Sequence, residues 1–356
     1  MRRFICTILP FIAALTACAD EETPFNELDR LRILGIRAEP PWLLEGETAS
    51  VDFLGVNNDP NLAGVPIRTR WHFCPLQADS TVGFECFIQS PEQLTTITGT
   101  TGLPDVLAAA TFTEFGVLFG TDSSVDIPFI LPPELIAQVC EQLDGIDLPP
   151  FVTRPACNGR FPITVYLEQG PPDPNQLDDD TAIDPARRLV GFRDIDLVYD
   201  TTLETNTPNR NPEIADVRVA PTTSSRFTLT TTTSTTPLKF DTTYNLEVDV
   251  GTDQAERFTP SDDDDPDQES LIVTWFIEGG ETDSVRTGFL PADDDDFSDL
   301  DSNVWTTPRR VDFEERTGLD CGTEVCTTQL FLVIRDNRGG LSWTIRTFEL
   351  NDRTGL

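Results

Sequence analysis

A single histidine limits the acid–base chemistry open to this chain. His72 is the only imidazole in the 356-residue sequence. It stands in an alternating segment in which Trp71 and Phe73 fall on one face and His72 on the other, as in a half-buried β-strand. The sequence contains no GxSxG elbow that would supply a serine nucleophile. We therefore expect His72 to be a partly exposed strand residue beside a disulfide rather than a catalytic base.

Carboxylates are the abundant reactive groups, and their number argues against a defined catalytic pair. The sequence has 61 aspartate and glutamate residues, so no glycosidase-type pair stands out. Together with the single histidine, this composition leads us to expect that the protein is not an enzyme.

Runs of aspartate could instead bind calcium, because this ion takes about six to eight hard oxygen ligands. The runs lie at 178–180, 262–265 and 293–296. An EF-hand is excluded for the second run, because Asp267 occupies the sixth position, where a glycine is required. We interpret the runs as solvated charged loops; the alternative is a weak or structural calcium site, which would be the only cofactor. The candidate ligands are Asp262, Asp264, Asp267, Asp293, Asp295 and Asp299.

The overall charge excludes one class of partner. With 25 basic against 61 acidic residues the net charge is −36, and such a surface repels phosphate backbones. We therefore expect no nucleic-acid partner. Hydrophobic residues make up 38% of the chain, which indicates a folded protein rather than a disordered one.

The N-terminal segment has the pattern of an export signal. Two arginines precede the apolar segment 4–15, which is shorter than the roughly 20 residues that a membrane-spanning helix needs. The segment ends in Leu15-Thr16-Ala17-Cys18, which resembles the lipobox of bacterial lipoproteins. In that family the cysteine is acylated and becomes the mature N-terminus, so the resemblance implies a signal peptide at 1–17 and a lipid on Cys18. The alternative is an ordinary signal peptide with an incidental cysteine.

The lipoprotein resemblance also implies a location. Ala19 follows the cysteine, where an aspartate signals inner-membrane retention in the best-known lipoproteins. We therefore expect an outer-membrane protein that contacts the membrane through its N-terminal lipid. Residues 18–29 are predicted to be a solvated tether between the lipid and the fold.

The remaining cysteines predict a set of disulfides. Of eight cysteines, Cys6 would leave with the signal and Cys18 would carry the lipid. An even number behind an oxidising export route predicts disulfides, and the clustering favours local pairs. A structural zinc site is the alternative, but the sequence has no CxxC motif to support it. The expected pairs are Cys74–Cys86, Cys140–Cys157 and Cys321–Cys326.

Alternating segments along the mature chain predict an all-β protein with two domains. Residues 30–200 are interpreted as one β-sandwich domain with a long, disulfide-clipped insertion, in which residues 134–143 have helical spacing. Residues 201–212 are rich in threonine, asparagine and proline, which predicts a linker. Residues 213–356 are interpreted as a second β domain that ends in a hairpin.

Two short motifs carry a resemblance to known domains. The segment Ile33-Leu34-Gly35-Ile36-Arg37-Ala38-Glu39-Pro40-Pro41, followed by Gly46-Glu47-Thr48, is similar to the start of immunoglobulin-like or PKD-like domains in lipoproteins of myxobacteria. The segment 333–340 with Trp343 is similar to the last hairpin of PKD-like repeats. The resemblance implies two immunoglobulin-like β-sandwich domains in the cell envelope, the first with the partly helical insertion. It implies no activity, because such domains serve adhesion, assembly and spacing alike.

The features combine into one leading hypothesis. We expect a non-catalytic, lipid-anchored cell-envelope protein that acts in binding, adhesion or envelope assembly, with an envelope protein or a glycan as its partner. One alternative is an accessory component of a secreted hydrolase. Another is a surface module that calcium stabilises.

Overall fold

Most regular structure in this protein is β-strand, as the alternating pattern predicts. Helices α3 (Pro133–Gly145) and α4 (Arg310–Thr317) and the short 3-10 helices η1 (Pro60–Leu62) and η4 (Thr252–Gln254) are the exceptions among the elements described. The computed structural model describes residues 28–78, 84–93, 111–129, 133–145, 147–152, 154–155, 157–202, 208–233, 235–259, 267–291 and 300–352.

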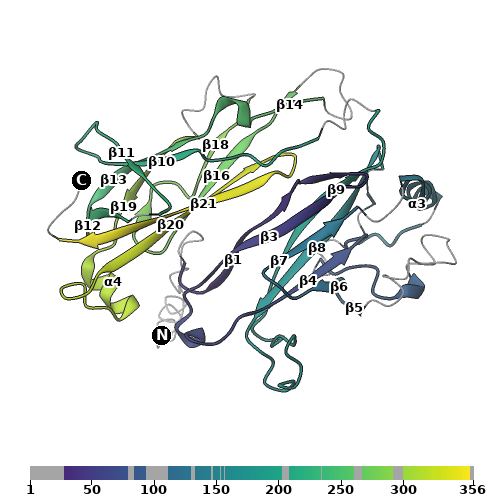
Figure 1. The fold of residues 1–356 in the computed structure, drawn as a ribbon, viewed down its shortest axis with the longest axis horizontal. Coiled ribbons are helices and arrows are strands. Elements are labelled where there is room, and N and C mark those ends of the chain that lie inside the picture. The colour runs from purple at the N-terminus through teal and green to yellow at the C-terminus, as the bar shows by residue number, and fades with distance from the viewer. Residues whose placement is uncertain are drawn as a thin grey trace, which may run out of the picture.

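The N-terminal half, residues 28–202, contains two sheets that face each other (Figure 1). The smaller sheet has the order β1-β3-β7, made of β1 (Leu31–Glu39), β3 (Thr48–Asn57) and β7 (Ser124–Pro128). The larger sheet has the order β2-β9-β8-β4-β6-β5, made of β2 (Trp42–Leu44), β9 (Leu189–Val198), β8 (Arg160–Gly170), β4 (Arg68–Cys74), β6 (Gly116–Gly120) and β5 (Phe112–Thr113).

The C-terminal half, residues 208–352, also contains two facing sheets and one small ribbon. The first sheet runs in the order β11 (Thr228–Thr230), β10 (Asp216–Pro221), β13 (Thr243–Asp249), β19 (Ser302–Thr306) and β17 (Glu281–Thr282). The second runs in the order β12 (Thr236–Lys239), β21 (Leu341–Asn351), β20 (Cys326–Asp336), β16 (Leu271–Ile277) and β18 (Arg286–Phe289). The ribbon pairs β14 (Arg257–Phe258) with β15 (Asp267–Gln268).

The two halves repeat one strand connectivity. In each half a short early strand pairs in parallel with the last strand of that half: β2 with β9, and β12 with β21. The sheet orders β2-β9-β8-β4-β6 and β12-β21-β20-β16-β18 then correspond strand for strand, as do β1-β3-β7 and β10-β13-β19. The chain is therefore a tandem structural repeat, which the sequence pattern alone does not reveal.

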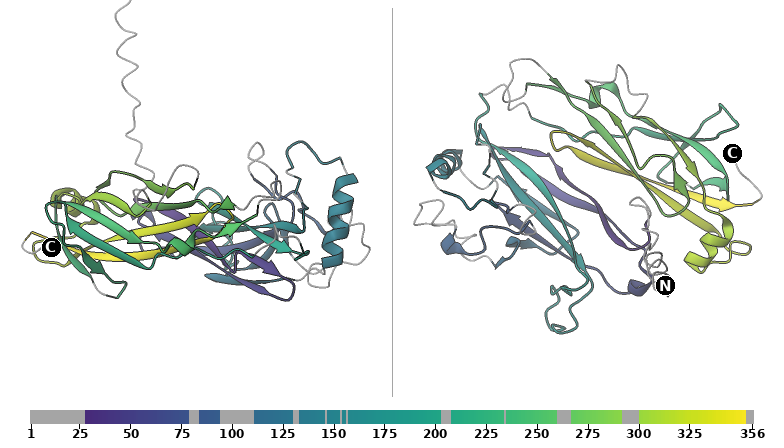
Figure 2. Two further views of the ribbon diagram at one scale, coloured as in Figure 1. Left: turned by 90° about the horizontal axis from the view of Figure 1, so that it is seen from above. Right: turned by 180° about the vertical axis from the view of Figure 1, so that it is seen from behind.

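Each half has its own hydrophobic core, and a third apolar cluster joins them. The core of the N-terminal half includes Trp71 and Ile195, and the core of the C-terminal half includes Trp275 and Trp305. The third cluster combines residues of β1 and β3 with residues of β16, β20 and β21. The two sheets of each half consequently stack along the long axis of a flat molecule, and the smaller sheet of the N-terminal half has apolar residues packed on both of its faces (Figure 2).

A local irregularity in β1 lets one short strand serve two cores. Ile36 lies in the core of the N-terminal half, whereas Leu34 lies in the cluster between the halves. The pairing with β3 shifts between Ile33 and Gly35, as in a β-bulge, and such a bulge redirects side chains to the other face. A Cβ on Gly35 would lie 3.2 Å from Leu341 Cδ2, so glycine lets β1 approach the C-terminal half closely.

The predicted helix is present, whereas the described end of the predicted linker does not behave as a linker. The helical spacing predicted at 134–143 corresponds to α3, whose Ile136, Val139 and Leu143 are buried. Within the predicted linker, however, Asn209 is only 2% exposed, and Asn211 donates its Nδ2 to the carbonyl oxygen of Ala38 at 2.7 Å. The end of this segment is therefore packed between the halves and is not a free spacer.

Candidate functional site

Most residues predicted to carry lipid or metal lie outside the described parts of the chain. This applies to Cys18 and, among the calcium candidates, to Asp262, Asp264, Asp293, Asp295 and Asp299. Asp267 is described: it is exposed in β15, and its Oδ1 accepts a hydrogen bond from the backbone N of Gln268 at 2.7 Å. The described residues contain no group of three or more metal-ligating side chains. Calcium binding therefore stays a prediction.

Three disulfides join the cysteine pairs that clustering predicts. Cys74–Cys86 links the end of β4 to the segment that follows it, and Cys140–Cys157 links α3 to the loop before β8. Cys321–Cys326 closes a short loop at the start of β20. The first two bridges hold the insertion of the N-terminal half against its larger sheet.

His72 is completely buried, so the prediction of a partly exposed residue is wrong. Its exposed fraction is 0%. The insertion covers the outer face of the larger sheet, where the Phe115 ring packs against the His72 ring at 5.8 Å between centroids. Alternation along β4 correctly places His72 opposite Trp71, but it does not show that both faces of this strand are covered.

The buried imidazole is the centre of a hydrogen-bonded charge network. Its Nε2 donates to Glu168 Oε2 at 2.6 Å, and its Nδ1 lies 3.0 Å from the hydroxyl of Thr113. Glu168 also pairs with Arg188 at 3.2 Å and lies 3.7 Å from Arg70. Burial opposes ionisation of Glu168, but the contacts with His72, Arg70 and Arg188 outweigh it and lower the pKa of this carboxyl.

The order Thr113–His72–Glu168 resembles a nucleophile–base–acid relay, but the surroundings assign it a structural role. The Thr113 hydroxyl already lies within hydrogen-bond distance of the carbonyl oxygen of Gly116, at 3.2 Å, and accepts from the backbone N of Phe115, also at 3.2 Å. Because His72 and Glu168 are 0% and 3% exposed, a substrate has no access to either of them. The network satisfies buried polar groups beneath the insertion.

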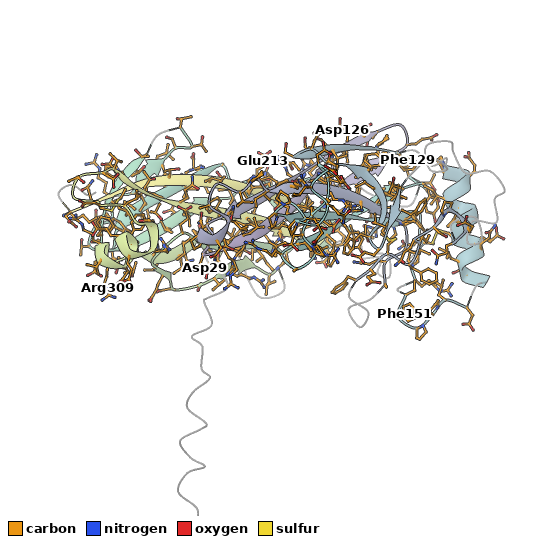
Figure 3. All side chains as sticks on the ribbon, turned by 90° about the horizontal axis from the view of Figure 1, so that it is seen from below. Asp29, Asp126, Phe129, Phe151, Glu213 and Arg309 are labelled. Carbon is orange, nitrogen blue, oxygen red and sulfur yellow. A yellow bond between two sulfur atoms is a disulfide. The ribbon has the colours of Figure 1, made fainter. Side chains whose placement is uncertain are left out.

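A groove of about 930 Å³ lies where the two halves meet. It runs along β1 and β9, and its other side is lined by residues of the C-terminal half, including Phe276, Arg335 and Leu341. This volume falls within the range of about 300 to 1,000 Å³ found for ligand sites. Asp29, next to the first residue of the groove, lies between Arg309 and Phe151 along the length of the molecule (Figure 3).

Four arginines line the groove, which is a local concentration of basic side chains in a strongly acidic protein. They are Arg30, Arg32, Arg193 and Arg335. The first two pair with Asp29, at 3.0 and 3.5 Å. Burial lowers the pKa of Arg193 and of Arg335, and in the second case the neighbouring Arg286 adds to the effect. Among the described residues neither Arg193 nor Arg335 forms an ion pair, and the buried Nε and Nη2 atoms of Arg193 have no hydrogen-bond partner. The carboxylates of Asp336, Asp194 and Asp196 oppose this lowering of the Arg193 pKa, but none of them forms an ion pair with its guanidinium. Burial of a guanidinium is costly unless a partner compensates it.

The sequence analysis missed Arg193, although alternation along its strand could have identified it as an inward-facing arginine. Along β9, period-two alternation places Arg193 on the same side as Gly191 and Ile195. Ile195 is 0% exposed, and a Cβ on Gly191 would lie 3.1 Å from Ile36 Cδ1, so this side faces the smaller sheet. An arginine on the inward side of a strand is a signal for a paired charge or a binding site.

Next to the groove, a tryptophan joins the two halves. Trp42 lies between two guanidinium groups, with Arg160 at 4.4 Å and Arg338 at 4.5 Å from its ring centroid. Its Nε1 donates to the carbonyl oxygen of Arg338 at 3.2 Å. Arg338 in turn pairs at 3.0 Å with Glu269, which is 0% exposed. We call Trp42, Arg160, Arg338 and Glu269 the Trp42 clasp.

Comparisons with known proteins give no family for this chain. No family model matches it, and no curated protein matches it. Solved structures that align include PcdhgB3 EC1-4 (9% identity, TM-score 0.19, covering 91% of this chain and 50% of that one). Others are a Salmonella alpha-2-macroglobulin mutant (10%, 0.17, 90% and 17%) and three N-terminal domains of the bacteriophage RB49 outer capsid protein Hoc (7%, 0.15, 91% and 99%). This chain thus spans half of the first structure and a small part of the second.

Proposed function

We propose that this protein is a non-catalytic, lipid-anchored component of the cell envelope that acts in binding, adhesion or assembly. The observation that carries the proposal is the apolar cluster between the halves, which packs the two β-sheet units against each other. A fixed spacing between two units suits a protein that presents a surface to a partner, because little conformational entropy is lost on binding.

The chemistry of the described residues supports a binding role over a catalytic one. The one histidine and its carboxylate partner are buried. The groove between the halves is open to solvent and is lined by arginines and apolar side chains. Such a surface binds a ligand without offering a general base or nucleophile to it.

We also propose that both halves are immunoglobulin-like sandwiches. Support comes from the repeated connectivity, in which a short early strand pairs in parallel with the last strand and two sheets enclose one core. Two packed antiparallel sheets with alternating inward residues define this architecture. The identity of the two connectivities is easier to explain by one repeated domain than by two unrelated folds.

The lipid anchor is proposed from the Leu15–Cys18 motif. No helix among the described residues is long and apolar enough to cross a membrane. We expect mass spectrometry of the purified protein to show an acylated Cys18 at the N-terminus. A Cys18→Ser variant should leave the membrane fraction, whereas the control Cys6→Ser should stay in it. A Cys18→Ser variant that partitions into the outer membrane like the wild type would contradict the proposal.

A further inference from the structure

The groove between the halves contains two sheet edges without neighbouring strands. β1 is an edge strand of its sheet, but its Leu34 and Ala38 carbonyl oxygens already accept hydrogen bonds from Arg335 and Asn211. In β9, residues 189–195 pair with β8 on one side, while β2 covers only 196–198 on the other. Within the described part of the chain no strand adds to either edge. Edges of this kind present backbone donors and acceptors to any extended peptide that reaches them.

Two arginines in the groove favour a negatively charged ligand. Arg193 and Arg335 line the groove without ion pairs among the described residues, although Asp336, Asp194 and Asp196 act on Arg193 from a longer distance. The Nη2 atom of Arg335 donates a hydrogen bond to the carbonyl oxygen of Leu34 at 3.1 Å. This bond keeps the guanidinium beside β1. Guanidinium groups bind carboxylates through two parallel hydrogen bonds.

The rest of the groove is apolar and fits alternate residues of a strand. Ile33, Leu34 and Leu341 line it together with the arginines. In an extended peptide successive side chains point to opposite faces. Acidic residues at every second position would therefore face the arginines, while the intervening residues would face the apolar lining or solvent.

We propose that this groove binds an extended acidic segment of a partner protein, which adds as a strand to the open stretch 189–195 of β9 and pairs its carboxylates with Arg193 and Arg335. The inference rests on the proposed binding function and names the partner class for it. The net charge of −36 repels acidic peptides elsewhere on the surface, so the groove is where such a segment is selected.

The test measures fluorescence anisotropy of a labelled peptide that alternates aspartate and valine, with the full-length chain purified in detergent. We expect saturable binding that weakens roughly ten-fold or more in Arg193→Gln and in Arg335→Gln, because each substitution removes a charge-assisted hydrogen bond to a peptide carboxylate. Arg226→Gln is the matched control: it also removes one positive charge, from an exposed residue of the C-terminal half, and should leave binding unchanged. Equal weakening in all three variants would overturn the proposal.

A second arm uses the wild-type chain only, so it does not depend on the folding of any variant. A peptide of the same sequence with every second amide N-methylated cannot complete a strand ladder and should not bind. Binding of the methylated peptide equal to that of the parent, or displacement of the parent by millimolar inorganic phosphate, would show a simple anion site and overturn strand addition. Because the protein is solubilised throughout, the result is independent of the Cys18→Ser membrane test.

Discussion

Arg338 in the β20–β21 turn lies over the indole ring of Trp42, with its guanidinium carbon 4.5 Å from the ring centroid. The two residues are separated by 296 positions in the chain. Because Trp42 follows β1 and Arg338 belongs to the last hairpin, this one contact ties the first strands of the N-terminal half to the end of the C-terminal half. Stacking of a cation on a partly desolvated ring adds about 1 to 2 kcal/mol beyond the buried area.

The Trp42 clasp should couple the unfolding of the two halves. We expect Trp42→Ala to lower the free energy of unfolding by about 3 to 5 kcal/mol, the usual cost of truncating a buried aromatic residue. It should also separate one calorimetric transition into two, because each half retains its own core. Differential scanning calorimetry of the full chain measures both effects. A single transition at the wild-type temperature would show that the clasp does not couple the halves.

Glu269 should make the stability of the clasp depend on pH. Burial and the negative charge of Asp336 raise the pKa of Glu269 to about 7, against the opposing effect of Arg338. A raised folded-state pKa means that the native state binds more protons than the unfolded state between about pH 4.5 and 7. The free energy of unfolding should therefore fall as pH rises through this window, by about 3 kcal/mol at most.

The matched variant for this pH dependence is Glu269→Gln, which imitates the protonated side chain. Urea unfolding of both proteins at several pH values should give a decline for the wild type and a flatter curve for the variant. Two parallel curves between pH 4.5 and 7 would show that Glu269 does not titrate in the folded state as its surroundings require.

The buried carboxylate of Glu168 should contribute far more to stability than the exposed carboxylate of Glu114, which pairs with the same arginine. Glu168→Gln removes the carboxylate that faces His72, Arg70 and Arg188, and should cost about 3 to 5 kcal/mol because it leaves buried charge uncompensated. Glu114→Gln is the control: Glu114 pairs with the same Arg188 but is 44% exposed, so its loss should cost less than about 1 kcal/mol. Chemical denaturation compares the two, and equal losses would contradict the assignment.

Protonation of Glu168 at low pH should also weaken the buried network. The pKa of Glu168 lies below its usual value because its contacts with His72, Arg70 and Arg188 outweigh burial. A lowered folded-state pKa contributes stability above the unfolded value of about 4.5, and this contribution is lost as pH falls through the folded value. Unfolding curves below pH 5 should therefore show a smaller acid dependence for Glu168→Gln than for the wild type.

The three disulfides should differ in their effect on stability. Cys140–Cys157 spans 17 positions and Cys321–Cys326 spans 5. Removing the longer bridge with a double alanine variant should cost about 3 kcal/mol, because it restores more freedom to the unfolded chain. Removing the shorter bridge should cost less. Denaturation of the two double variants side by side measures the difference, and the reverse order would contradict this account.

Local patterns in the sequence determined the features that depend on neighbouring residues. Alternation predicted the all-β class and placed Trp71 on an inward face, helical spacing predicted α3, and clustering predicted the three disulfide pairs. Each of these depends on contacts within a strand, a helix turn or a short loop. Local sequence contains the information for such contacts.

Tertiary structure decided what covers each face and which strands remain without neighbours. Alternation along β4 separates the two faces of the strand, but only the packing of Phe115 and the rest of the insertion buries His72. Likewise, the contact of Trp42 with Arg338 and the arginine groove along β1 form because segments from opposite ends of the chain pack together. The free energy of such contacts depends on burial and distance between residues far apart in sequence, which a period counted along one segment does not contain.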